Sequence, residues 1–130
     1  MGNVLLYLGT FFTLLGLDAL WLYFVAMKLF TKYLSHLAGK TQIVPAVLFY
    51  LFYTVGILVL VVLPYNDDPK KVFLLGALLG AIAYGTYDLT NLATLRNWPL
   101  NFALIDITWG TIVTAVTALI ASFLARKIGV

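Results

Sequence analysis

The chain has 130 residues, of which 63% are hydrophobic and only 10% are charged, and its mean hydropathy is +1.03. Soluble globular domains average about 25% charged residues, so this composition excludes an ordinary soluble domain. The net charge of +3 is small and dispersed, and lysines that flank membrane helices explain it better than a nucleic-acid partner does. The absence of cysteine excludes disulfides and thiolate metal sites.

Four long apolar runs follow one another along the chain. They are Val4–Met27, Ile43–Leu63, Val72–Leu95 and Leu100–Leu124. Each exceeds the roughly 20 residues that an α-helix needs to cross the hydrocarbon core of a bilayer. Backbone polar groups in lipid must be paired within the chain, so runs of this length predict helices. We therefore expect an all-α polytopic membrane protein, with residues 1–130 forming one domain. It should be an antiparallel bundle of four transmembrane helices at about 4–27, 43–63, 72–95 and 99–124.

The segment Lys28–Gln42, between the first two runs, has two faces. Basic side chains recur at every fourth position: Lys28, Lys32, His36 and Lys40. Apolar residues fill the other face, which predicts a short amphipathic segment at the membrane interface that stops at Gly39. A continuation of the first helix, with its lysines reaching to the interface, is the alternative.

The other two connections are short. Pro64–Lys71 is a turn by composition, and Arg96–Pro99 is short enough to make the third and fourth helices a tight hairpin. Asn97 is expected to cap the fourth helix, with Pro99 in its first turn. Trp98 is expected to anchor this turn at the membrane interface.

Four spans place both chain ends on one side of the membrane. Each side carries four Lys or Arg residues, so the positive-inside rule does not decide the orientation. The basic face of the first connection has no acid to offset it. This favours a cytoplasmic position for that connection, with the N- and C-termini outside.

Three aspartates are the only charged residues within the apolar runs: Asp18, Asp88 and Asp106. A charged side chain at a helix centre costs about 3 kcal/mol on insertion scales, so such residues are candidates for a functional site. At a rise of 1.5 Å per residue, all three lie about 10–15 Å from the same side of the membrane. We therefore expect three helices to bring them together in the bundle interior.

Aromatic and amide side chains share the helix faces that carry these acids. Trp21 and Trp109 each follow an aspartate by three positions, and Asn91 follows Asp88 by three. Indole, hydroxyl and amide groups can hydrogen-bond a buried carboxyl or a ligand. The candidate ligand or proton site consists of Asp18, Trp21, Tyr84, Tyr87, Asp88, Asn91, Asp106 and Trp109.

The spacing of Asp18 and Trp21 is repeated by Asp106 and Trp109. The first and fourth helices run antiparallel, so this repeat is compatible with an inverted two-plus-two arrangement, and also with coincidence. Carboxylates and an amide would suit Mg²⁺, Mn²⁺ or Ca²⁺. No histidine accompanies them in the apolar runs, and we expect neither a metal nor another cofactor.

The region around the third connection resembles a known family. The stretches that carry the resemblance are Thr86–Asn91, Thr94–Leu95, Trp98–Pro99, Asp106 and Trp109–Gly110. They are similar to the signature of domain-of-unknown-function family 2177, and Leu17–Leu22 resembles the opening motif of that family. The resemblance covers the whole chain. It implies a small four-helix protein of the bacterial inner membrane and no established activity.

Two classes of function fit these observations. The first is a binder or transporter of a small molecule or lipid, in which the aspartates carry protons or cations. Four helices are few for a permeation path, so a homodimer in the lipid bilayer is expected, as in small multidrug exporters. The second is an intramembrane enzyme that modifies a lipid, such as its fatty acids, with an aspartate as general acid or base. A purely structural role for the acids is a third alternative. We favour binding or transport, because no nucleophile or metal triad is evident.

Overall fold

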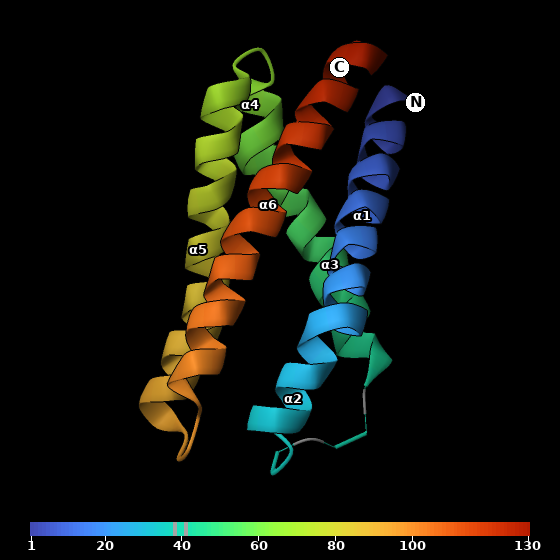
Figure 1. The fold of residues 1–130 in the computed structure, drawn as a ribbon. Coiled ribbons are helices and arrows are strands. Elements are labelled where there is room, and N and C mark those ends of the chain that lie inside the picture. The colour runs from blue at the N-terminus through green and yellow to red at the C-terminus, as the bar shows by residue number, and fades with distance from the viewer. Residues whose placement is uncertain (38, 41) are drawn as a thin grey trace.

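The computed structural model describes residues 1–37, 39–40 and 42–130. Four long helical columns run up and down the molecule (Figure 1). The first consists of α1 (Gly2–Trp21), η1 (Leu22–Ala26) and α2 (Met27–Tyr33), and the second of α3 (Ile43–Ile57), η2 (Leu58–Val62) and α4 (Leu63–Tyr65). The third and fourth are α5 (Pro69–Thr94) and α6 (Leu100–Ile128). All four are long and apolar enough to span a membrane, which confirms the four-helix membrane bundle that the sequence predicts.

The columns alternate in direction. Both chain termini and the α4–α5 turn lie at one end of the bundle, which we call the terminal end (Figure 1). The connection from α2 to α3 and the α5–α6 turn lie at the other end, which we call the hairpin end. Each column therefore runs antiparallel to the one that precedes it.

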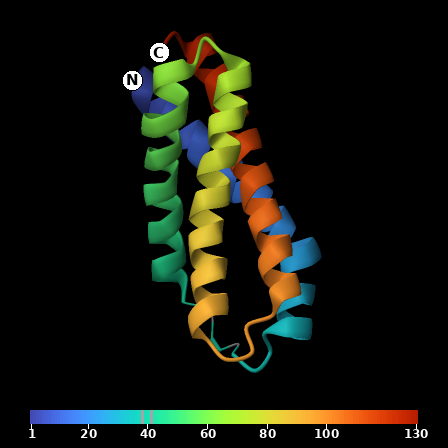
Figure 2. The same cartoon turned by 90° about the vertical axis from the view of Figure 1, so that its left-hand side faces the viewer.

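The apolar core fills mainly the half of the bundle nearer the terminal end. Its fully buried side chains come from all four columns and include Leu6, Leu14, Ile57, Val62, Val72 and Val113. At the hairpin end the packing is looser, because every residue from Ile43 to Phe49 at the start of α3 is exposed. Figure 2 shows this part of α3 at the edge of the bundle.

Glycines allow α5 and α6 to pack closely along each other. Gly76 and Gly80 on α5 and Gly110 on α6 face the neighbouring helix, where an added Cβ would collide with its backbone or side chains. Small residues at helix interfaces are the usual means of close approach in membranes, where no hydrophobic effect drives two helices together. The hairpin of α5 and α6 is therefore the most closely packed pair in the bundle.

The segment after the first apolar run begins as a continuation of the first helix, which is the alternative that the sequence left open. The first column continues without a break to Tyr33, and a turn follows in which the backbone N–H of Leu37 donates to the carbonyl of Leu34 at 2.9 Å. Leu34 is buried against Trp98 and Phe102, which fixes the chain there and ends the helix before Gly39. Two residues of the expected segment, at positions 38 and 41, lie outside the described residues.

The start of α6 differs from expectation. The N-cap position is Pro99, and Asn97 adopts a left-handed conformation with φ of 65° instead of capping the helix. Asparagine is one of the few residues besides glycine that accept this conformation at low cost. The reversal between α5 and α6 therefore depends on Asn97 as a turn residue.

Two wider helical turns interrupt the first and second columns. In η1 the backbone N–H of Met27 donates to the carbonyl of Leu22, and in η2 that of Leu63 donates to Leu58, five residues back in each case. Such π-type turns occur frequently next to functional sites. Here η1 begins directly after Trp21, one of the candidate site residues.

Candidate functional site

Asp18 joins three helices through one carboxyl group. The side chain leaves α1 and is only 7% exposed. One oxygen, Oδ1, accepts a hydrogen bond from the indole Nε1 of Trp109 on α6 at 2.8 Å. The other, Oδ2, accepts a hydrogen bond from the hydroxyl of Tyr50 on α3. Both oxygens of this one carboxyl group are therefore acceptors for donors from two other helices.

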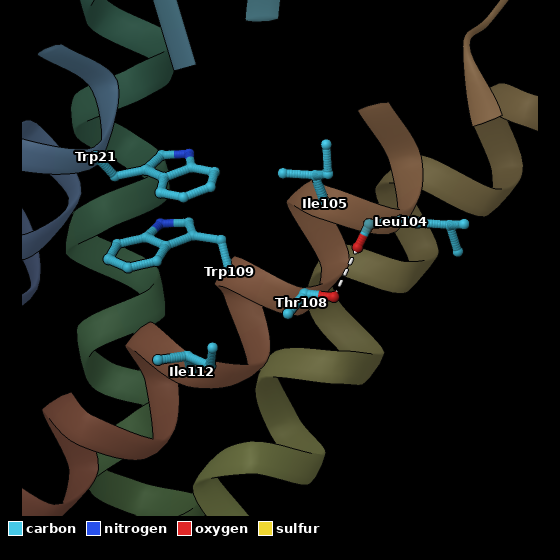
Figure 3. Close-up of a pocket in the computed structure, with 6 residues that line it drawn as sticks. All are labelled: Trp21, Leu104, Ile105, Thr108, Trp109 and Ile112. Carbon is cyan, nitrogen blue, oxygen red and sulfur yellow. Dashed lines mark hydrogen bonds between the residues drawn. The ribbon is translucent and has the colours of Figure 1, made fainter. Parts of the chain in front are cut away.

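Two stacked indole rings cover this carboxyl. The rings of Trp21 and Trp109 lie 4.6 Å apart between centroids, with an angle of 3° between their planes (Figure 3). Trp21 follows Asp18 by three positions on α1, so helical geometry places both side chains on the same face. We call Asp18, Trp21, Tyr50 and Trp109 the Asp18 cluster.

An apolar groove of about 280 Å³ lies on the outer side of the stacked indoles. Trp21, Leu104, Ile105, Thr108, Trp109 and Ile112 line it (Figure 3). The one hydroxyl in this lining, that of Thr108, donates to the carbonyl of Leu104 at 2.8 Å. Trp109 therefore belongs both to this groove and to the hydrogen bonds of Asp18.

A second layer of aromatic side chains extends the site towards α5. The hydroxyl groups of Tyr53 on α3 and Thr114 on α6 are hydrogen-bonded at 2.6 Å. The ring of Tyr84 on α5 lies against Gly110 and meets the Tyr53 ring edge to face, at 6.2 Å between centroids. Tyr84 therefore packs between α3 and α6, within electrostatic range of both Asp18 and Asp106.

Tyr53→Phe tests the hydrogen bond between α3 and α6. The free energy of unfolding in detergent should fall by about 0.6–1.7 kcal/mol, the range measured for hydrogen bonds between membrane helices. Thr114→Val should have a similar effect, and the double variant should lose no more than either single variant. Fully additive losses in a chemical unfolding series would show that the two hydroxyls act independently.

Asp88 presents the most unusual environment in the molecule. Its side chain is fully buried on α5, and among the described residues neither carboxyl oxygen has a hydrogen-bond partner. Asp106 on α6 and the indole of Trp98 lie beside this carboxyl. Trp98 is 8% exposed, and its Nε1 likewise has no partner among the described residues. We call Asp88, Trp98 and Asp106 the Asp88 cluster.

Aromatic packing holds Trp98 in this position. Its ring meets those of Tyr87 and Phe102 edge to face, with centroids 5.7 and 5.8 Å away. The sequence predicts Trp98 as an anchor at the membrane interface; the structure shows its ring buried among protein side chains at the hairpin end of the bundle. The left-handed turn at Asn97 places it there.

The remaining candidate residues lie at the edge of the two clusters. Asn91 is partly buried and follows Asp88 by one helical turn on α5. Tyr87 is 48% exposed, although its ring packs on Trp98. Seven of the eight candidate residues are therefore buried or partly buried, and Tyr87 is about half exposed.

The three carboxyls form a connected series. Asp106 interacts electrostatically with both Asp88 and Asp18. The two aspartate–tryptophan pairs of equal spacing have different partners. Trp109 follows Asp106 in the sequence but hydrogen-bonds Asp18, and Asp106 lies next to Asp88. Within the described part of the chain, no group of three or more His, Cys, Asp or Glu side chains is arranged to hold a metal ion.

A family model described as "Predicted membrane protein (DUF2177)" matches residues 3–123. The chain belongs to the DUF2177 family. The match includes every residue of both clusters and extends into all four columns, and it confirms the family that the sequence motifs resemble. No curated protein and no solved structure gave a significant match. DUF2177 membership therefore supports a multi-pass membrane protein without assigning it an activity.

Three residues that complete the site in this DUF2177 protein were not among the sequence candidates. They are Tyr50, Tyr53 and Trp98. The two tyrosines lie on the one apolar run without an aspartate, so no charge marked them. A pair of tyrosines three positions apart in an otherwise apolar helix was the available signal.

Proposed function

We propose that the protein binds a small cationic ligand inside the membrane at the Asp18 cluster and carries it across. The observation that carries this proposal is the Asp18 carboxylate, which is buried and held by two donors from different helices. Neither donor carries a positive charge, so among the described residues this carboxyl group has no basic hydrogen-bond partner. A buried negative charge without a basic partner favours the binding of a cation.

The charges around the site support a cationic ligand. The charged side chains within the apolar runs are all acidic, and the nearest basic residues along the chain are Lys28 and Arg96 at column ends. Each of these is exposed. Electrostatic repulsion between Asp18 and Asp106 would be relieved by a positive charge from outside the chain.

The aromatic residues support an organic cation with an apolar part. A cation over an indole or phenol ring is stabilised by about 0.5–2 kcal/mol, and the Asp18 cluster contains three such rings. The apolar groove on the outer side of Trp109 would take up a hydrocarbon portion of the same molecule. The chemical class that fits is therefore a lipophilic amine or quaternary cation.

A pair of probes with the same shape and opposite charge tests this proposal. Tetraphenylphosphonium should bind the purified protein in nanodiscs, measured by calorimetry, and tetraphenylborate should not. Asp18→Asn should weaken binding of the cation by about tenfold or more, since it removes the charge that the cation meets. Asp67→Asn, the same change in the exposed α4–α5 turn, serves as the control. Equal binding of the two probes, or an unchanged affinity in Asp18→Asn, would refute a cation site.

Transport is tested separately from binding. Proteoliposomes that contain the protein should accumulate tetraphenylphosphonium faster than empty vesicles, and Asp18→Asn vesicles should match the empty ones. Binding without uptake would limit the proposal to a binding protein. A lipid species missing from a deletion strain, together with absence of binding, would instead favour the intramembrane enzyme.

We also propose that the protein acts as a homodimer in the bacterial inner membrane, with both termini outside. The exposed lysines Lys28, Lys32 and Lys40 support this orientation, because they gather at the hairpin end and suit an anionic cytoplasmic surface. Reporter fusions at each terminus test the orientation. Activity on the cytoplasmic side alone would reverse it.

A further inference from the structure

The Asp88 cluster contains complementary polar groups that are buried and unpaired. Asp88 offers two acceptor oxygens and Trp98 one N–H donor, and none of these atoms has a partner among the described residues. An isolated carboxylate in such a position is very costly, because burial removes its hydration and nothing replaces it. A neutral carboxyl group in the same position is far less costly. The geometry is therefore that of a carboxylic acid and not of a carboxylate.

The neighbours of Asp88 favour the same protonation state. Asp106 lies beside it, and two adjacent carboxyl groups resist carrying a negative charge each. The other titratable groups that act on this pair are Tyr87, through Asp88 and Asp106, and Asp18, through Asp106. Tyr84 on α5 also faces Asp106. None of these residues can supply a positive charge.

We propose that Asp88 and Asp106 form a proton-binding site in which Asp88 carries the proton and shares it with Asp106. The O–H of Asp88 then donates to the Asp106 carboxylate. The other oxygen of Asp88 is left to accept the N–H of Trp98, and these two hydrogen bonds would satisfy all three polar groups. Aspartic proteases use a comparable pair of acids with one proton between them.

This site supplies an exchange step for the proposed cation transport, and that part of the inference rests on the proposed function. Asp106 interacts electrostatically with Asp18, so a cation at Asp18 alters the charge balance at the Asp88 cluster. One positive charge arrives, and the proton leaves Asp88 for the solvent. The total charge of the two clusters is then the same before and after binding.

Infrared spectroscopy of the protein in nanodiscs at neutral pH tests the proton directly, without any ligand. The wild type should show the C=O stretch of a protonated carboxyl, with a shift in D₂O. Asp88→Asn should lose this band, whereas Asp67→Asn, the same change in the exposed α4–α5 turn, should keep it. Trp98→Phe should move the band to higher frequency, because the C=O group loses its donor. A wild type without the band, or an unchanged band in Asp88→Asn, would overturn the proton site.

Proton release distinguishes this inference from the proposed function. Adding tetraphenylphosphonium to the wild type in weak buffer should release about one proton per bound cation, and Asp88→Asn should bind without release. Binding without release in the wild type would refute the exchange step. Failure of the cation to bind at all would refute the proposed function, and the infrared band would still decide the proton site.

Discussion

Asp18→Asn is expected to destabilise the protein, and Asp88→Asn is expected to leave its stability unchanged or raise it. Asparagine has one acceptor oxygen, so at position 18 either Tyr50 or Trp109 loses its acceptor. A buried donor left without a partner costs about 1–3 kcal/mol. At position 88 asparagine keeps one N–H donor towards Asp106 and one acceptor oxygen for Trp98, and the cost of burying an acid disappears.

Thermal and chemical unfolding in one detergent would measure this contrast, with Asp67→Asn as the exposed control. Both buried substitutions should impair cation binding or its proton release, although their effects on stability are opposite. Equal destabilisation by the two would show that both acids mainly hold helices together. Equal stabilisation would show that the hydrogen bonds of Asp18 contribute little in a membrane environment.

Gly80→Ala and Gly110→Ala are expected to separate α5 from α6. A Cβ on Gly80 would collide with the carbonyl of Gly110 and come within 2.8 Å of the Thr114 side chain, and a Cβ on Gly110 would collide with the ring of Tyr84. Overpacking of this kind costs about 1–3 kcal/mol, and here backbone atoms prevent easy relaxation. Gly110→Ala should also displace Tyr84 from its position between α3 and α6.

Gly16→Ala is the matched control for these variants. Gly16 is exposed on α1, and nothing lies within 4 Å of an added Cβ. Alanine in place of a mid-helix glycine should stabilise the protein by up to about 1 kcal/mol. Melting temperatures in detergent would rank the three variants. Similar values for all three would show that the close approach of α5 and α6 contributes little to stability.

The four helical columns could be predicted because the thickness of the bilayer sets the length of each run, and its hydrocarbon core requires the run to be apolar. The ends were less predictable, since an apolar run marks the part of a helix in lipid and not where the helix stops. The fourth run ends at Leu124, but α6 continues through Arg126 and Lys127 to Ile128. Arginine and lysine have high helix propensity, so the helix continues beyond the apolar run without a break.

The burial of the acids was also predictable, because aspartates in a membrane helix avoid lipid. Spacing along one helix identifies a shared face, as for Asp18 and Trp21. It does not give the rotation of one helix against another. For that reason Tyr50 was not identified as a partner of Asp18, and Trp98 was predicted as an interface anchor and not as a neighbour of Asp88. The position of Trp98 depends on the backbone of Asn97, which the sequence alone suggested as a cap.

The parallel stack of Trp21 and Trp109 also gives the molecule an optical signal of its own. The chain has three tryptophans, and the third, Trp98, lies in the Asp88 cluster. Indoles that are stacked 4.6 Å apart with nearly parallel planes couple their electronic transitions, and the resulting circular dichroism depends on their mutual orientation. In a Trp98→Phe protein this coupled pair would be the sole indole chromophore. Its spectrum would follow any movement of α1 relative to α6 without an attached dye.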